Sequence, residues 1–125
     1  TGPFQGCKMQ WRDTEPPVGS GQRSVALSYY LALMTGTCLD LIEGTGPTIV
    51  EGPFAHNAEF IAMLKAVTHR PVFTSEAVTG TSIGAALLFN HHEKLPNASS
   101  AENPHVGEDL LNYVDRWRTL VQTGR

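Results

Sequence analysis

Apolar residues of this chain recur at two spacings, one typical of helices and one typical of short buried strands. A spacing of three and four residues predicts a long helix that is capped by Ser20 or Ser24 and ends at Gly44. The apolar stripe of this helix is expected to consist of Leu27, Leu31, Met34, Cys38, Leu41 and Ile42.

The middle of the chain combines both patterns. Runs rich in β-branched residues at Thr48–Glu51 and Val72–Thr74 predict two short buried strands. Between them, a helix is expected from His56 or Asn57 to Thr68. Its apolar stripe consists of Phe60, Ile61, Leu64 and Val67.

Two further helices are expected in the second half of the chain. One is introduced by Thr79–Ser82 and ends near His91, and the other covers Glu108 to Gln122. A weaker strand pattern lies near the start, at Lys8–Arg12. The stripe of the last helix consists of Leu110, Leu111, Val114, Trp117, Leu120 and Val121.

The order of these elements predicts an α/β fold with a short sheet and crossover helices. The two strands should be parallel, because a helix joins them. We divide the single expected domain, residues 1–125, into a turn-rich start (1–22), a core (23–92), a loop (93–107) and a terminal helix (108–123).

Composition and charge narrow the class of protein. With 125 residues, 41% hydrophobic and 17% charged, the chain is expected to be one globular unit. A formal charge of −3 and the lack of a Lys/Arg cluster argue against nucleic-acid binding. Two distant cysteines, Cys7 and Cys38, indicate neither a disulfide framework nor a zinc site, which fits a cytoplasmic location.

No membrane partner is expected either. The most apolar stretch, Val25 to Ile42, is interrupted by polar residues such as Ser28 and Asp40, which favours a helix of a protein core. The chain opens at Thr1 with a Gly/Pro-rich run, and we therefore expect it to be a fragment of a larger protein.

The segment between the first strand and the second helix is the candidate binding site. In α/β sheets such a turn can present backbone N–H groups and a helix dipole to an anionic ligand, so Gly52 to Asn57 is a candidate nucleotide or phosphate site. The alternative is structural: Gly52 and Pro53 only make a turn and Asn57 only caps the helix. Walker A and dinucleotide-binding fingerprints are absent from the sequence.

The succession IVEGPFAHNAEFIAML and RPVFTSEAVTGTSIGAALL resembles the C-terminal half of the FGGY carbohydrate kinases. The upstream segment YYLALMTGTCLDLI is similar to the preceding helix of that family. The resemblance implies part of an actin-like, ribonuclease-H-like ATPase lobe, with ATP and magnesium as cofactors. It also implies transfer of the ATP γ-phosphoryl group to a sugar or polyol bound mainly by an N-terminal lobe.

Carried over by resemblance, Gly52 matches the first glycine of the family's adenosine-binding turn and Asn57 the Asn near the adenine. Pro53 stands where a second glycine is usual and cannot donate an N–H, so Phe54 and Ala55 would have to supply the donors. The family's catalytic Asp and metal-binding acid lie upstream of this sequence, so no catalytic residue is assigned.

Two functions follow as alternatives. The first is a fragment of a carbohydrate kinase, inactive by itself and prone to self-association because a missing lobe leaves apolar surface uncovered. The second is a noncatalytic α/β interaction or oligomerisation module on the same scaffold.

Overall fold

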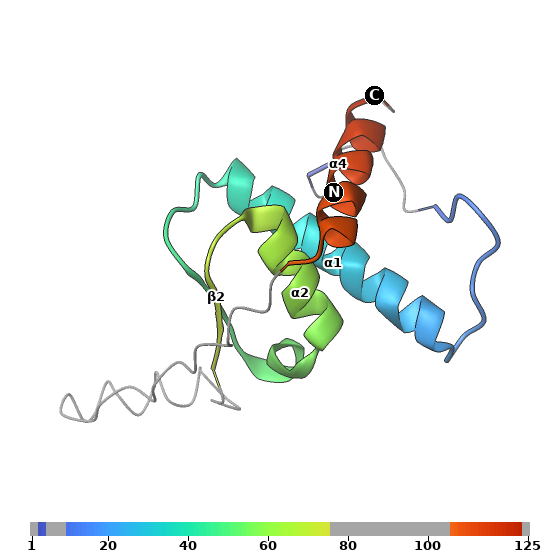
Figure 1. Cartoon of the computed structure of the whole chain (residues 1–125), viewed down its shortest axis with the longest axis horizontal. Coiled ribbons are helices and arrows are strands. Elements are labelled where there is room, and N and C mark those ends of the chain that lie inside the picture. The colour runs from blue at the N-terminus through green and yellow to red at the C-terminus, as the bar shows by residue number, and fades with distance from the viewer. Residues whose placement is uncertain (1–2, 5–9, 76–105, 124–125) are drawn as a thin grey trace.

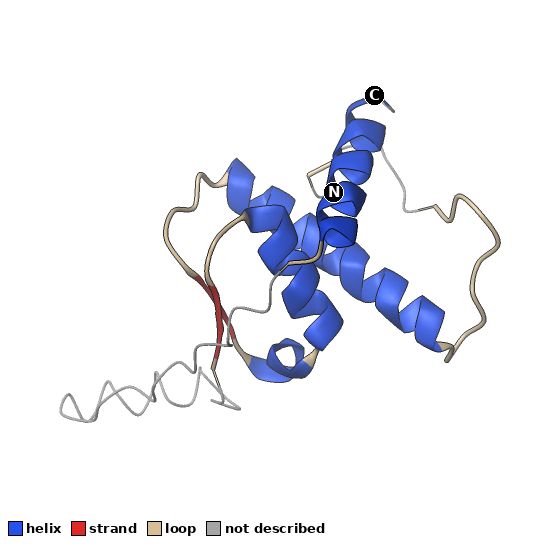
Figure 2. Cartoon of the chain, in the orientation of Figure 1, coloured by secondary structure: helices blue, strands red, loops and turns tan. Residues whose placement is uncertain are grey.

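The computed structural model describes residues 3–4, 10–75 and 106–123 (Figure 1). In this part of the chain the α-helices group together, and the strands lie at one side of the group (Figure 2). The expected helix introduced by Thr79–Ser82 lies outside the described residues, as does most of the expected loop 93–107. The described elements are, in order, α1 (Gly21–Leu41), β1 (Thr48–Val50), the 3-10 helix η1 (Gly52–His56), α2 (Ala58–Thr68), β2 (Val72–Thr74) and α4 (Glu108–Thr123).

Helix α1 begins and ends close to the predicted positions. The Ser20 side chain accepts a hydrogen bond from the backbone N–H of Arg23, at 3.3 Å, which confirms Ser20 as the cap. At the other end the backbone of Glu43 is left-handed (φ 51°), and the N–H of Gly44 donates to the carbonyl of Leu39 at 3.0 Å. This closes the helix as Schellman motifs do, with Glu43 at the position where glycine is usual.

The face that α1 buries is not the predicted one. The predicted stripe is largely exposed, with Leu31, Leu41 and Ile42 at 41%, 66% and 72% exposure. The reason is a close approach to α2, where a Cβ on Gly36 would lie 2.6 Å from Cγ1 of Val67. Small side chains allow that approach, and three of the four buried residues of α1 are small, namely Ser28, Ala32 and Gly36, whereas Leu33 is large.

Helix α2 is the centre of the core. It contacts α1, α4, η1 and β2, and nearly all of its length is buried. Its predicted stripe is confirmed, with Phe60, Ile61, Leu64 and Val67 no more than 7% exposed. Because neighbours cover several of its sides, residues outside the stripe are buried as well, namely Met63, Lys65, Ala66 and Thr68.

The two strands form a parallel pair, as predicted. Thr48 is opposite Val72, Ile49 is opposite Phe73 and Val50 is opposite Thr74. Val50 and Val72 belong to the buried core, whereas Ile49 is 57% exposed. Successive side chains of a strand point to opposite faces, so one face of the sheet packs on the core and the other carries Ile49. Gln10–Arg12, the described part of the weaker strand pattern, forms no strand.

Helix α4 packs on α2 through part of its predicted stripe. Val114 is 1% exposed, and the guanidinium of Arg118 donates to the backbone carbonyl of Val67 at 2.9 Å. Tyr113 meets Tyr29 of α1 edge to face, with ring centroids 5.6 Å apart. Leu120, expected in the stripe, is 42% exposed.

Helix α1 is long and apolar enough to cross a membrane by length and composition, with a mean hydropathy of 1.2. A core helix of a soluble protein can meet the same criterion. In this chain the small residues of α1 pack on α2, and 22% of the tested window is buried.

Candidate functional site

The candidate turn begins directly at the carboxyl end of β1. The carbonyl of Val50 accepts a hydrogen bond from the N–H of Ser75 at 3.0 Å, which extends the pairing of the strand ends by one step. Gly52 then turns the chain with φ +73°, a conformation that residues with a side chain rarely adopt. A Cβ at Gly52 would meet nothing within 4 Å, so glycine is needed for the backbone conformation and not for space.

The turn continues as η1, and its hydrogen bonding changes the expected role of two residues. In a 3-10 helix each N–H donates to the carbonyl three residues earlier, as the N–H of Asn57 does to the carbonyl of Phe54 at 3.1 Å. The N–H groups of Phe54 and Ala55 are therefore directed back into the turn. Pro53 has no N–H at all. The turn thus offers a phosphate fewer donors than the sequence pattern suggests.

The carboxamide of Asn57 forms hydrogen bonds through both its oxygen and its nitrogen. Its Oδ1 accepts from the N–H of Phe60 at 2.9 Å, which caps α2, and its Nδ2 donates to Oγ of Ser28 at 2.9 Å. Ser28 lies on α1 and is 5% exposed. The capping role expected for Asn57 is therefore observed, together with a contact to α1 that the sequence does not indicate. One N–H and one lone pair of the carboxamide remain for a further partner.

The outer surface of η1 carries an aromatic ring. Phe54 is 43% exposed, and its ring lies 4.9 Å from that of the buried Phe60, at an angle of 51°. Ala55 packs against the core, and Pro53 and His56 are exposed. The solvent-exposed surface of the turn therefore consists mainly of the phenyl ring of Phe54, the pyrrolidine ring of Pro53 and the imidazole of His56.

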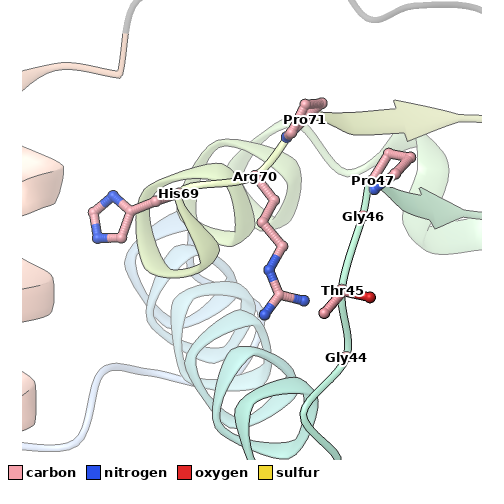
Figure 3. Close-up of a pocket in the computed structure, with 7 residues that line it drawn as sticks. All are labelled: Gly44, Thr45, Gly46, Pro47, His69, Arg70 and Pro71. Carbon is pink, nitrogen blue, oxygen red and sulfur yellow. The ribbon is translucent and has the colours of Figure 1, made fainter.

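A separate open hollow of about 460 Å³ lies between the segments that precede the two strands, residues 44–47 and 69–71 (Figure 3). The Arg70 side chain extends toward Gly44 and Thr45, whereas His69 points away from them. A guanidinium nitrogen of Arg70 lies 3.7 Å from Oδ1 of Asp40, near the end of α1. Ligands of parallel α/β sheets bind outside the carboxyl ends of the strands. This hollow is at the amino ends, so we do not take it as the site.

The described residues contain no cluster of three His, Cys, Asp or Glu side chains that could hold a metal ion. Within the same part of the chain, every buried side-chain nitrogen or oxygen has a hydrogen-bond partner.

A comparison with protein families identifies the class. The profile described as "Carbohydrate kinase FGGY, C-terminal domain" matches residues 1–98. The chain belongs to the FGGY carbohydrate kinase family. This confirms the resemblance, and the short parallel α/β sheet agrees with the ribonuclease-H-like C-terminal domain of FGGY kinases. Comparisons with curated proteins and with solved structures give no significant match.

The match shows an FGGY kinase domain, which implies a phosphotransferase acting on carbohydrates. Of the five expected site residues, Gly52, Pro53, Phe54 and Ala55 lie together on η1, and Asn57 caps the helix that follows. Ser28, which holds the Asn57 carboxamide, was not expected, because nothing in the sequence connects two residues of separate helices.

Proposed function

We propose that this chain forms part of the adenosine-binding lobe of an ATP-dependent carbohydrate kinase. The family match over residues 1–98 carries this proposal, and the position of Gly52–Asn57 at the carboxyl end of β1 supports it. In the whole protein the γ-phosphoryl group of ATP would pass to a hydroxyl of a sugar or polyol. Such transfer depends on positioning and on electrostatic stabilisation.

The described residues suit the adenosine part of the nucleotide. The outer surface of η1 carries the rings of Phe54 and Pro53 and the imidazole of His56, and the Asn57 carboxamide retains hydrogen-bonding capacity. They offer the phosphates few donors, because the N–H groups of Phe54 and Ala55 donate within η1. Nor do the described residues include a group of three His, Cys, Asp or Glu side chains that could hold a metal ion. We therefore assign neither a magnesium ligand nor a catalytic residue to the described part of the chain.

Calorimetric titration of Mg·ADP into the 125-residue chain tests the proposal. We expect weak one-to-one binding, dominated by the nucleoside, so that adenosine retains most of the binding free energy of ADP. Tripolyphosphate should bind far more weakly than ADP. No heat of binding with either adenosine or ADP would contradict the proposal.

The noncatalytic alternative predicts a different binding result. It predicts a stable partner or a dimer with no affinity for nucleotide, whereas the kinase proposal predicts nucleotide affinity.

We further propose that the purified chain gives no sugar-dependent turnover of ATP, because the resemblance places the catalytic Asp outside this sequence. Steady ADP release that requires an added pentulose, hexulose or polyol would show that catalytic residues are present.

We also propose that the chain acts in the cytoplasm and associates with itself when purified. The self-association is expected because Leu41, Ile42 and Ile49 are more than half exposed. Sedimentation velocity over a range of concentrations tests this expectation. A chain that stays monomeric at high concentration would contradict it.

A further inference from the structure

The ring of Phe54 is fixed on one side and accessible elsewhere. It contacts Phe60, which is 6% exposed and belongs to the core, with ring centroids 4.9 Å apart. Yet 43% of Phe54 is exposed to solvent. Exposure of a large apolar side chain beside a candidate ligand site suggests a contact that the isolated chain does not make.

The backbone around the ring is restricted on both sides. Gly52 has φ +73°, Pro53 fixes its own φ, and the chain after η1 is held where Asn57 caps α2. A ring on such a turn loses little conformational freedom when a ligand covers it. Pre-organisation of this kind favours binding by lowering its entropic cost.

The chemistry of the turn favours a flat aromatic ligand group. In η1 the N–H groups of Phe54 and Ala55 donate within the turn, as those of a 3-10 helix do, and Pro53 has none to offer. An anion would therefore find few donors there. A nucleobase, by contrast, stacks on an aromatic ring whatever its pattern of donors and acceptors.

We propose that the Phe54 side chain is the platform on which the adenine base of the nucleotide stacks. This inference rests on the proposed adenosine-binding function and adds the residue that recognises the base. Asn57, three residues later, has one N–H and one lone pair left to reach the edge of a base held on that ring.

Calorimetry of ADP binding with Phe54 variants of the whole chain tests the proposal. Phe54→Ala and Phe54→Leu should weaken ADP binding by roughly 5- to 150-fold, the range that loss of base–aromatic stacking gives. Phe54→Tyr keeps an aromatic face and should stay within about threefold of the wild type. Tyr113→Ala is the matched control, because Tyr113 is 45% exposed and also pairs with one ring, that of Tyr29, but lies on α4. It should leave ADP affinity unchanged.

Nuclear magnetic resonance of the ligand separates stacking from a change in folding. The adenine H2 and H8 signals should move upfield on binding to the wild type and to Phe54→Tyr, through the ring current, and much less with Phe54→Leu. Melting curves of each variant show whether the fold is retained.

The outcomes separate this inference from the proposed function. If the wild type binds ADP and Phe54→Leu binds it equally well, the stacking role is wrong while the nucleotide site stands. If the wild type does not bind ADP, both are wrong. If Phe54→Leu changes only the self-association of the chain, the ring belongs to a protein interface and the stacking role is overturned.

Discussion

The carboxamide of Asn57 donates a hydrogen bond to the hydroxyl of Ser28 across 29 residues of sequence, at 2.9 Å. The same carboxamide caps α2, so one side chain fixes the start of α2 and attaches it to α1. The candidate turn is thereby held between β1 and a residue that the core holds in place.

Replacing Asn57 by Ala should lower the free energy of unfolding by about 2 kcal/mol, because a helix cap and a second hydrogen bond are both lost. Ser28→Ala removes only the second bond and should lower it by about 1 kcal/mol. Urea denaturation measures both values. A loss of stability in Asn57→Ala with unchanged ADP affinity would remove Asn57 from the nucleotide site.

Replacing Gly36 by Ala should destabilise the chain by about 1–3 kcal/mol, because the new methyl group would meet Val67 at 2.6 Å. At an unconstrained position in a helix the same change is stabilising. Gly21→Ala is therefore the matched control, since a Cβ there meets nothing within 4 Å. Combining Gly36→Ala with Val67→Ala should cause less destabilisation than the sum of the single changes. A stabilising Gly36→Ala would contradict the close packing of α1 on α2.

The sequence predicted the order of the described α-helices and strands because these elements depend on local patterns, and it predicted the parallel pairing because a helix joins the two strands. The bounds of β2 and α4, and the capping of α2 by Asn57, agree with the structure to within a residue. The buried face of α1 was predicted wrongly, because three of its four buried residues, Ser28, Ala32 and Gly36, are small and add little to an apolar pattern.

The candidate site was only partly predictable for a similar reason. The position of the turn follows from Gly52 and from the strand before it. The 3-10 hydrogen bonding that engages the N–H groups, and the contact of Phe54 with Phe60, depend on how the turn packs on α2. Sequence patterns do not encode such packing.

Variants of two glycines with positive φ test whether ADP binds at the candidate turn, which contains Gly52, or in the hollow near Arg70, which contains Gly46. Gly52 and Gly46 have φ +73° and +86°, and a Cβ at either would meet nothing within 4 Å. Changing either to Ala should therefore destabilise the chain to a similar extent, by about 1–2 kcal/mol, through backbone strain alone. Calorimetry should show weaker ADP binding for Gly52→Ala only. Weaker binding for Gly46→Ala instead would place the site in the hollow.

Amide chemical-shift mapping of the isotope-labelled chain during titration with Mg·ADP tests the proposed nucleotide site most directly. The account predicts that the largest shifts fall on the backbone N–H groups of Gly52, Phe54, Ala55, His56 and Asn57, with little change at residues 44–46 and 69–70. Shifts concentrated at residues 44–46 and 69–70, or none at any ADP concentration, would contradict it.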